Sequence, residues 1–306
     1  GMRKTQDFNS PPFEGAGFHD FTMYQGRRQS TSKTFLKPAL GRTNLHVTTR
    51  AHVEKIIFEN KRAVGLQYKR SNDRMTVSAR KEIILAAGVV NSPILLMQSG
   101  VGDGDSLRSL DIPVVSHLPG VGKNLQDHLG IYVSYECFRP IGLRRLMRPD
   151  RAALALLQAL LFATGPGSTL PLRCCGIDRS SPGVEIPDIK MTMIPALVVE
   201  NPWKRSELDG YAIHAYQLRP QSRGHISLRS PDPDEKPLID PKYLSHEKDR
   251  MVIRHALFRI RDIARQSPLS RHTRVEIAPG DEEDNESKVD DWIARNATTA
   301  FHPVGT

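Results

Sequence analysis

Alternating apolar and polar positions predict a hairpin in the first third of the chain. Residues 52–59 and 62–70 are rich in β-branched and aliphatic residues, which favours strands. Asn60 and Lys61 between them fit a tight turn. Residues 45–49 have the same character and predict a further strand before the hairpin.

A different pattern follows at residues 81–88, where the apolar run over 83–87 is unbroken. A strand without alternation is typical of a sheet that is covered on both faces, so burial is expected here. Next, Ser92 can cap a helix with Pro93 in its first turn, and Gly100 can end that helix. Such a strand–turn–helix unit lets backbone N–H groups approach a ligand, although an ordinary connection has the same pattern.

The middle of the chain contains a helix that is apolar nearly all round, over residues 152–163, after a basic cluster that begins at Arg144. One interpretation is a peripheral membrane contact through residues 144–163. The other, which the pattern favours, is a buried helix or a lid, because the run is too short to span a bilayer.

Alternation returns over residues 188–228 and predicts an antiparallel sheet, and a Pro- and Asp-rich break follows at 230–237. An amphipathic helix is expected over about 246–266, and residues 287–297 also fit a helix. The fold class expected is therefore mixed α/β and α+β, in which an antiparallel sheet is flanked by helices.

Two polar motifs need a chemical interpretation. Asn124, Gln126, Asp127 and His128 follow two turn glycines and could bind a metal, but carboxamides are poor metal ligands, so a hydrogen-bonded structural corner is favoured and no metal site is expected. The glycines of GAGFHD, residues 15–20, have dinucleotide-like spacing. That motif is rejected, because no strand precedes it and Asp20 stands at the third position.

Length and composition restrict the number of domains, the partners and the compartment that can be expected. A chain of 306 residues suits one large or two ordinary domains. Its net charge of +9 is spread along the sequence without aromatic-interleaved basic motifs, so nucleic acid is not an expected partner. An anionic cofactor, or a more acidic portion outside this sequence, explains the excess equally well. Three cysteines form neither a disulfide framework nor a zinc motif, which favours a cytoplasmic setting, with membrane association as the alternative.

Several segments in order resemble the glucose–methanol–choline (GMC) flavoprotein oxidoreductases, and most closely their choline dehydrogenase and alcohol dehydrogenase branch. They are QGRRQSTSKTFLKPAL with RTNLHVTTRAHVEKIIFENKRAVG, KEIILAAGVVNSPILLMQSGVG with LPGVGKNLQDH, SRGHISLRSPDPDEKPLIDPKYL with the following SHEKDR, and FHPVGT. Val89 departs from the pattern, since a small residue is usual there.

The resemblance implies an FAD-dependent enzyme that oxidises a small alcohol to a carbonyl. Family members begin with a strand–GxGxxG–helix unit and continue beyond HPxGT, and this sequence has neither. It is therefore expected to be the middle of such an enzyme, and to bind FAD weakly or not at all by itself. The alternative is an inactive remnant, or an interaction protein that does not bind FAD.

The resemblance also implies a division into domains. Residues 1–45 would join the two domains, 46–130 would form a partial, Rossmann-like FAD-binding domain, 131–285 a substrate-binding domain, and 286–306 a return to the FAD domain. The sequence leaves open the particular alcohol, the electron acceptor and the oligomeric state.

His302 is the candidate catalytic residue. Removal of a hydroxyl proton needs a base that works near neutral pH, which suits a neutral imidazole, and His302 matches the family's catalytic histidine. The resemblance further implies that Val53, Ala87 and Gly88 contact the cofactor, although Val53 also fits an ordinary strand position. Arg173 and Arg219 stand where choline-specific members carry a carboxylate and a second histidine, so choline is not the expected substrate.

Overall fold

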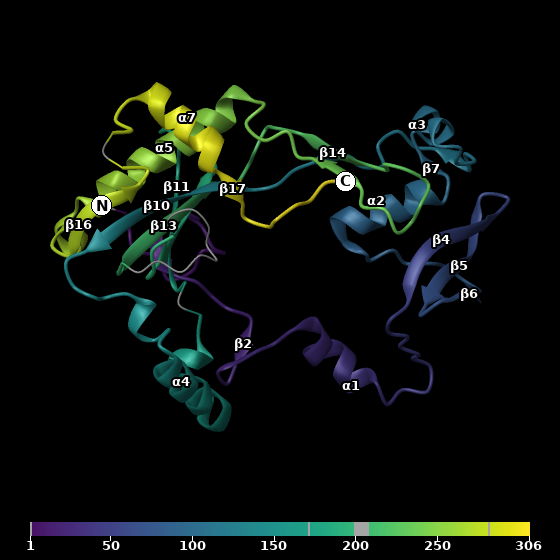
Figure 1. Ribbon diagram of the computed structural model, residues 1–306, viewed down its shortest axis with the longest axis horizontal. Helices are drawn as coiled ribbons and strands as arrows, with labels where there is room; N and C mark the ends of the chain where they lie inside the picture. The colour runs from purple at the N-terminus through teal and green to yellow at the C-terminus, as the bar shows by residue number, and fades with distance from the viewer. Residues whose placement is uncertain (1, 171, 199–207, 281) are drawn as a thin grey trace. The chain divides into compact units, whose positions relative to one another are not determined.

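The chain divides into two compact units (Figure 1). The structure is a computed structural model that describes residues 2–170, 172–198, 208–280 and 282–306. Unit 1 contains residues 1–41, 128–219 and 246–300, and unit 2 contains residues 42–127, 220–245 and 301–306. Each unit is therefore assembled from segments that are far apart in the sequence.

These units do not follow the domain boundaries expected from the sequence. Residues 220–245 belong to unit 2 because β14 (Gly224–Ser227) pairs with β9 (Lys123–Leu125). Residues 286–300 belong to unit 1, where α7 (Glu286–Asn296) packs on α5 (Glu247–Ala264). Which unit serves the cofactor and which the substrate stays a prediction.

Among the described residues, the core of unit 1 is a seven-stranded antiparallel sheet. The antiparallel sheet predicted over residues 188–228 is confirmed as far as Gln217, whereas residues 224–227 pair in a separate three-stranded sheet of unit 2. Gly15 and Gly17 lie in a strand rather than in a nucleotide-binding turn. Strand β13 is buried along its whole length, since it lies inside the sheet beneath α5. The path is β1 (Gly15–Phe18), β11 (Cys174–Asp178), β12 (Ile189–Ile194), β13 (Gly210–Gln217), β10 (Leu129–Cys137) and β16 (Thr273–Ala278), with β17 (Thr298–Thr299) also paired to β10.

The predicted helices of unit 1 are confirmed. Helix α5 places a stripe of small and aliphatic residues against β13 and β10, at the spacing of one helix face. Its N-terminus is capped by the His246 side chain, which accepts a hydrogen bond from the Lys248 N–H, and Asn285 caps α7 in the same way. The short α6 (Ser267–Ser270) leads from α5 to β16.

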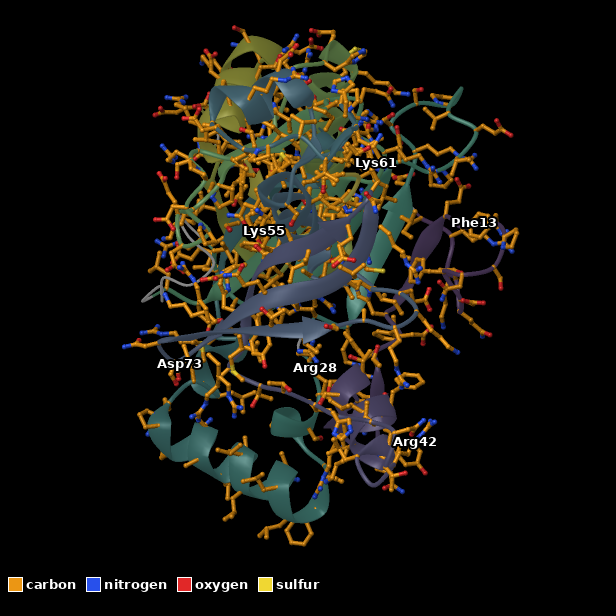
Figure 2. All side chains as sticks on the ribbon, turned by 90° about the vertical axis from the view of Figure 1, so that its right-hand side faces the viewer. Phe13, Arg28, Arg42, Lys55, Lys61 and Asp73 are labelled. Atoms are coloured by element: carbon orange, nitrogen blue, oxygen red, sulfur yellow. The ribbon has the colours of Figure 1, made fainter. Side chains whose placement is uncertain are left out.

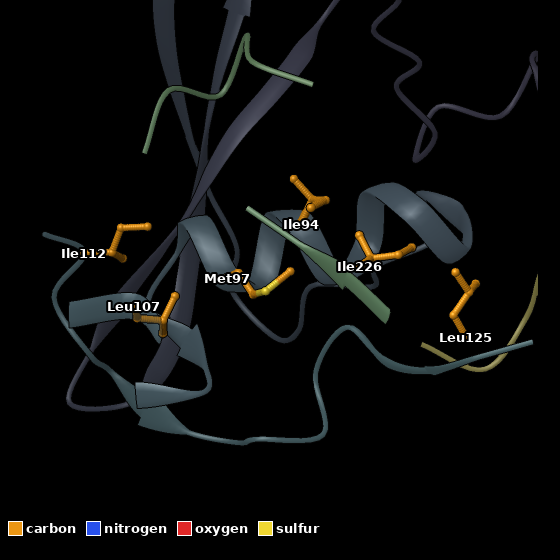
Figure 3. Close-up of a cluster of buried hydrophobic side chains, with 6 residues drawn as sticks. All are labelled: Ile94, Met97, Leu107, Ile112, Leu125 and Ile226. Atoms are coloured by element: carbon orange, nitrogen blue, oxygen red, sulfur yellow. The ribbon is translucent and has the colours of Figure 1, made fainter. Parts of the chain in front are cut away.

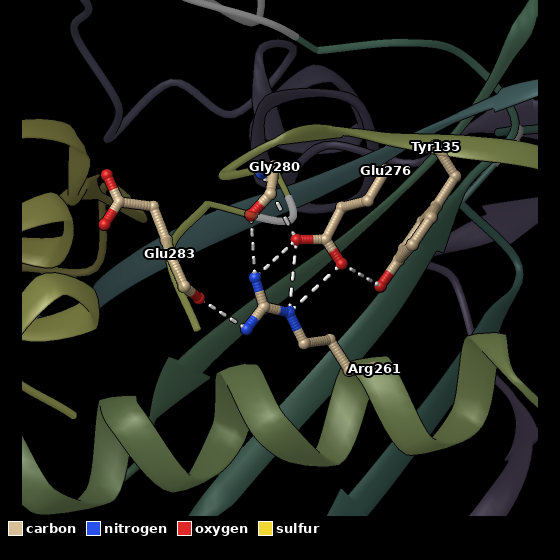
Figure 4. Close-up of polar contacts among 5 residues, drawn as sticks. All are labelled: Tyr135, Arg261, Glu276, Gly280 and Glu283. Carbon is tan, nitrogen blue, oxygen red and sulfur yellow. Dashed lines mark hydrogen bonds and ion pairs between the residues drawn. The ribbon is translucent and has the colours of Figure 1, made fainter. Parts of the chain in front are cut away.

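A buried ion pair joins α5 to the sheet (Figure 4). Arg261 lies 2.7 Å from Glu276, and the two side chains are only 9% and 7% exposed. The guanidinium also donates to the carbonyls of Glu283 and Gly280, at 2.8 and 3.1 Å. Tyr135 donates to Glu276 at 3.1 Å. Burial, together with the Glu276 carboxylate, raises the pKa of Tyr135, so its phenol remains protonated as the donor.

The remaining elements of unit 1 are short, apart from one helix. They are β2 (Met23–Tyr24), β3 (Arg27–Arg28), η1 (Ser32–Leu36), α1 (Lys37–Ala39), η2 (Leu143–Arg145), α4 (Pro149–Phe162) and η3 (Pro166–Ser168). The apolar helix expected over 152–163 is confirmed as α4. The expectation of a buried helix is wrong for this chain, because none of its residues is buried, whereas the expectation of a lid stays a prediction.

Unit 2 opens with the predicted hairpin, extended by a third strand. Strands β4 (His52–Glu59), β5 (Arg62–Arg70) and β6 (Asp73–Ser78) form an antiparallel meander, on which Figure 2 labels Lys55, Lys61 and Asp73. Asn60 and Lys61 both have positive φ, at 48° and 65°, as a two-residue hairpin turn requires. The strand predicted at residues 45–49 is wrong, because that segment pairs with no described strand and is largely exposed.

The buried strand predicted over residues 81–88 is also wrong for this chain. Residues 82–86 pair with no described strand, and Ile84 is 79% exposed. An apolar run becomes a buried strand only when neighbouring strands and covering helices exist, and the described residues supply none at this place.

Helix α2 (Gly88–Gln98) holds the core of the rest of unit 2. It begins earlier than predicted, so Pro93 lies inside it rather than in its first turn, and the predicted end is confirmed by Gly100 with φ of +86°. Around it lie α3 (Gly104–Ser109), the parallel pair β7 (Val101–Gly102) and β8 (Ser116–His117), and the sheet β15 (Leu238–Asp240), β14 and β9. The buried cluster in Figure 3 is Ile94, Met97, Leu107, Ile112, Leu125 and Ile226.

We expect Arg261→Met to lower the free energy of unfolding by about 3–5 kcal/mol, because it leaves the Glu276 carboxylate buried without its partner. Arg265→Met is the matched control one turn on, where the side chain is 75% exposed, and should change stability by about 0.5 kcal/mol or less. Urea denaturation of the purified chain measures both. Equal effects of the two substitutions would contradict the role of the buried pair.

Candidate active site

The segment Phe301–Thr306, which carries His302, pairs with residues 124–127 of the polar motif. Gln126 and Val304 exchange two backbone hydrogen bonds, each of 2.8 Å. The side-chain amide of Asn124 donates to the Gly305 carbonyl at 3.3 Å. Two motifs that are far apart in the sequence therefore form one short antiparallel contact within unit 2.

Asp127 fixes the backbone of His302. The Asp127 side chain is buried at 8% exposure, and its Oδ1 accepts the His302 N–H at 2.9 Å. Its Oδ2 accepts the Tyr243 hydroxyl at 2.5 Å. A buried carboxylate needs such donors to offset its lost hydration, so these two bonds hold the segment in place. The hydrogen-bonded structural corner predicted for this motif is confirmed.

Pro93 explains how the end of this segment attaches to α2. In a regular helix the N–H of residue 93 would donate to the carbonyl of residue 89, but proline has no N–H. The Val89 carbonyl is instead an acceptor for the Thr306 hydroxyl, at 2.5 Å. The residue that departs from the family pattern, Val89, thus takes part through its backbone.

Backbone conformation restricts two positions of the segment. Gly305 has φ of +105°, and a Cβ there would lie 2.3 Å from the Asn124 carbonyl oxygen, so only glycine fits. Phe301 has φ of +61°, which is uncommon for a non-glycine residue and turns the chain just before His302.

All the predicted site residues lie in unit 2. The His302 side chain is exposed, and its segment is joined to the first turn of α2, where Gly88 lies. Ala87 precedes that helix. Val53 lies on β4, half-buried and in register with Tyr68, and β4 contacts α2 along the helix. A hydrogen bond from Thr306 thus joins the His302 segment to the start of α2, and β4, which carries Val53, packs on the same helix.

The start of α2 has the features of an anion-binding position. Ala87 makes no side-chain capping bond to the helix. Gly88 has φ of +84°, and a Cβ there would meet no atom within 4 Å. The first N–H groups of a helix lack intrahelical partners and carry partial positive charge, which favours an anionic group. These residues therefore fit part of an anionic cofactor such as FAD.

Sequence reasoning assigned no role to Tyr243 and Thr306. Tyr243 lies in a turn between Lys242 and Leu244, which both have positive φ, at 50° and 55°. No local sequence pattern predicts this turn. The missing helix partner of Val89 could have been inferred from Pro93 once the helix start was known. Among the described residues, no group of three or more His, Cys, Asp or Glu side chains could hold a metal ion.

Comparisons with known proteins define the class. Family models of GMC oxidoreductase match residues 1–130 and 220–306. The mitochondrial choline dehydrogenase of Mus musculus is 40% identical over 306 residues, and the oxygen-dependent choline dehydrogenase of Brucella ovis is 38% identical over the same length. The chain belongs to the GMC oxidoreductase family, as its motifs predicted. It covers 51% and 56% of those two relatives, so it spans about half of their length.

Solved structures agree on the fold. Pyridoxine 4-oxidase from Mesorbium loti matches with a TM-score of 0.86 and 26% identity, over 100% of this chain and 56% of that one. An FAD-dependent oxidoreductase from Chaetomium thermophilum matches with a TM-score of 0.85 and 21% identity, over 99% and 59% of the two chains. The mixed α and β fold expected from the sequence is confirmed.

We expect Asp127→Asn to accelerate hydrogen exchange of the His302 amide by about 10- to 100-fold, because a charge-assisted hydrogen bond is replaced by a weaker neutral one. Hydrogen–deuterium exchange with mass spectrometry measures the Phe301–Thr306 segment. Tyr243→Phe removes the other bond to Asp127 and should give a smaller increase, whereas Asp73→Asn on the exposed strand β6 should give none. Unchanged exchange in the Asp127 variant would show that this carboxylate does not hold the segment.

Proposed function

We propose that this chain supplies the proton-accepting part of an FAD-dependent oxidoreductase that converts the CH–OH group of a small alcohol to a carbonyl. The observation that carries the proposal is the placement of His302. Its backbone is held by Asp127 and by the Gln126–Val304 pairing, while its imidazole is exposed. A rigid backbone with an accessible side chain is what a general base requires.

In this proposal His302 takes the hydroxyl proton of the alcohol. A neutral imidazole has a basic nitrogen near neutral pH and becomes a cation when it accepts the proton. Pro303 restricts the backbone of His302 to extended shapes, which limits where the imidazole can point. FAD, when bound, supplies the hydride acceptor at the flavin N5.

The cofactor contacts are proposed for the α2 start and for β4. Ala87 and Gly88 would contact the cofactor through their backbone, which no other described residue covers at Gly88, and Val53 would contact it from β4. The exposed apolar run before α2 supports the same assignment, because Ile84 and its neighbours would be covered once further strands of the FAD-binding unit lie beside them.

The substrate is proposed to be a small alcohol other than choline, although the curated relatives named above are choline dehydrogenases. Arg173 and Arg219 are both exposed cations. If they face the substrate, as the family resemblance implies, they repel a quaternary ammonium group.

In the FAD-loaded enzyme that contains this chain, His302→Ala should lower turnover with alcohols by about 10²- to 10⁴-fold while flavin stays bound, since a general base contributes about that much. Steady-state rates and the visible flavin spectrum measure the two effects separately. His46→Ala, at another exposed histidine of unit 2, is the matched control and should leave turnover unchanged. Near-normal turnover of His302→Ala would assign the base to another residue.

The chain of residues 1–306 alone should bind FAD weakly or not at all and be colourless when purified. The family's GxGxxG unit, which grips the diphosphate, is absent from this sequence. Addition of that unit from a curated relative should restore a yellow protein, as measured by visible absorbance after gel filtration. Stoichiometric flavin in the chain alone would contradict the prediction, and no flavin in either sample would favour the alternative of an inactive remnant.

A further inference from the structure

Helix α4 of unit 1 is apolar and exposed at the same time. From Ala152 to Ala163 it has no charged residue, and Gln158 is its only polar one. None of its residues is buried, and Leu154, Leu160 and Phe162 are 66%, 62% and 70% exposed. Figure 2 shows the carbon side chains of this teal helix, at the bottom of the view, projecting outward. Exposure of this much apolar surface marks an interaction site.

The apolar face points away from the contacts that hold the helix. Ala155 and Ala159 lie against η3, where a Cβ on Gly167 would come within 2.6 Å of the Ala155 carbonyl oxygen and 3.1 Å of the Ala159 Cβ. At about 100° per residue, the leucines occupy the opposite arc of the helix. They are Leu154, Leu156, Leu157, Leu160 and Leu161, all more than half exposed.

A basic segment leads directly into this face. Residues 138–151 contain five arginines and a single carboxylate, Asp150. Asp150 pairs with Arg148 at 3.1 Å, and none of the other four arginines forms an ion pair with a described residue. Phe138, Ile141 and Met147 in the same segment are exposed apolar residues, at 66%, 50% and 49%. Cationic and apolar side chains are thus interspersed next to the leucine face.

We propose that residues 138–163 bind an anionic membrane surface, with α4 lying in the interface plane. The leucine face would enter the boundary between headgroups and acyl chains, and the arginines would contact lipid phosphates and carboxylates. The charge pattern favours an anionic membrane over an apolar groove on another protein, because such a groove would offer no negative charge to the arginines. None of the described helices is long and apolar enough to cross a membrane, and α4 has 14 residues, so an in-plane position is the one that fits.

Sedimentation with vesicles tests the proposal on the purified chain. We expect it to sediment with vesicles of phosphatidylcholine and phosphatidylserine, more weakly with phosphatidylcholine alone, and more weakly again as salt is added. Arg144→Ala/Arg145→Ala should weaken binding to the mixed vesicles on the order of 30-fold. Arg265→Ala/Arg271→Ala is the control with the same loss of charge and should bind nearly as the parent chain does.

The apolar contribution has its own variants. Leu157→Glu/Leu161→Glu should abolish sedimentation, whereas Met75→Glu/Val77→Glu, which adds the same charge at exposed apolar positions of β6, should retain most of it. Circular dichroism checks that each variant is folded. If the leucine variant does not fold, Leu157→Trp offers a second measurement, in which brominated lipids should quench the new indole by several-fold.

The proposal is overturned if the chain does not sediment with anionic vesicles, or if the indole at position 157 is not quenched. It is also overturned if the leucine or arginine variants bind as their controls do. A dimer in analytical ultracentrifugation that the leucine variant dissociates, without any vesicle binding, would assign the face to a second copy of the chain. The test needs no flavin and no turnover, so it is independent of the proposed function.

Discussion

The Asp127 carboxylate joins parts of unit 2 that are far apart in the sequence. It accepts the backbone N–H of His302 and the hydroxyl of Tyr243, so the polar corner, the loop after β15 and the segment Phe301–Thr306 meet at one buried group. Loss of hydration makes a buried carboxylate costly unless donors surround it, and the donors here come from the segments that must be held. The position of the candidate base therefore follows from the requirement to satisfy one charge.

At α2 and α5, too, a polar group is hydrogen-bonded by residues from another segment of the chain. Pro93 removes a helix donor, and Thr306 provides another for the Val89 carbonyl, which joins the His302 segment to the helix whose start is the proposed cofactor contact. In unit 1, the buried Arg261 guanidinium forms an ion pair with Glu276 and donates hydrogen bonds to two backbone carbonyls. Polar groups placed inside each unit thus specify which segments meet, while the apolar clusters supply most of the stabilisation.

Two of the apolar regions that the described residues leave exposed differ in character. The run around Ile84 is extended, has no basic neighbours beyond Arg80 and Lys81, and has the pattern of a strand that lies inside a sheet. Helix α4, in contrast, is apolar around most of its circumference and follows a segment that is rich in arginine. Further strands would cover the run around Ile84, whereas a lipid surface suits α4, because only α4 combines apolar area with concentrated positive charge.

Local sequence was sufficient where the determining interactions are short in range. The hairpin at Asn60 and Lys61 follows from turn chemistry and alternation, and α5 and α7 follow from the helical pattern of their residues. The motifs also identified the family and singled out His302, Asp127 and Gly88. In each case the pattern is set by a backbone preference or a periodicity that a few neighbouring residues contain.

The tertiary structure decided what depends on partners distant in the chain. An apolar run is a buried strand only where other strands lie beside it, so residues 82–86 are exposed or half-buried and none of them is buried, despite their composition. Tyr243 has no local signal, and its role exists only because Asp127 lies within reach of its hydroxyl. The assignment of residues 220–245 to unit 2 likewise depends on the pairing of β14 with β9. The sequence by itself therefore determined the elements that local patterns specify and the candidate chemistry, whereas long-range pairing decided which apolar runs become strands, their burial and the contacts that hold the site.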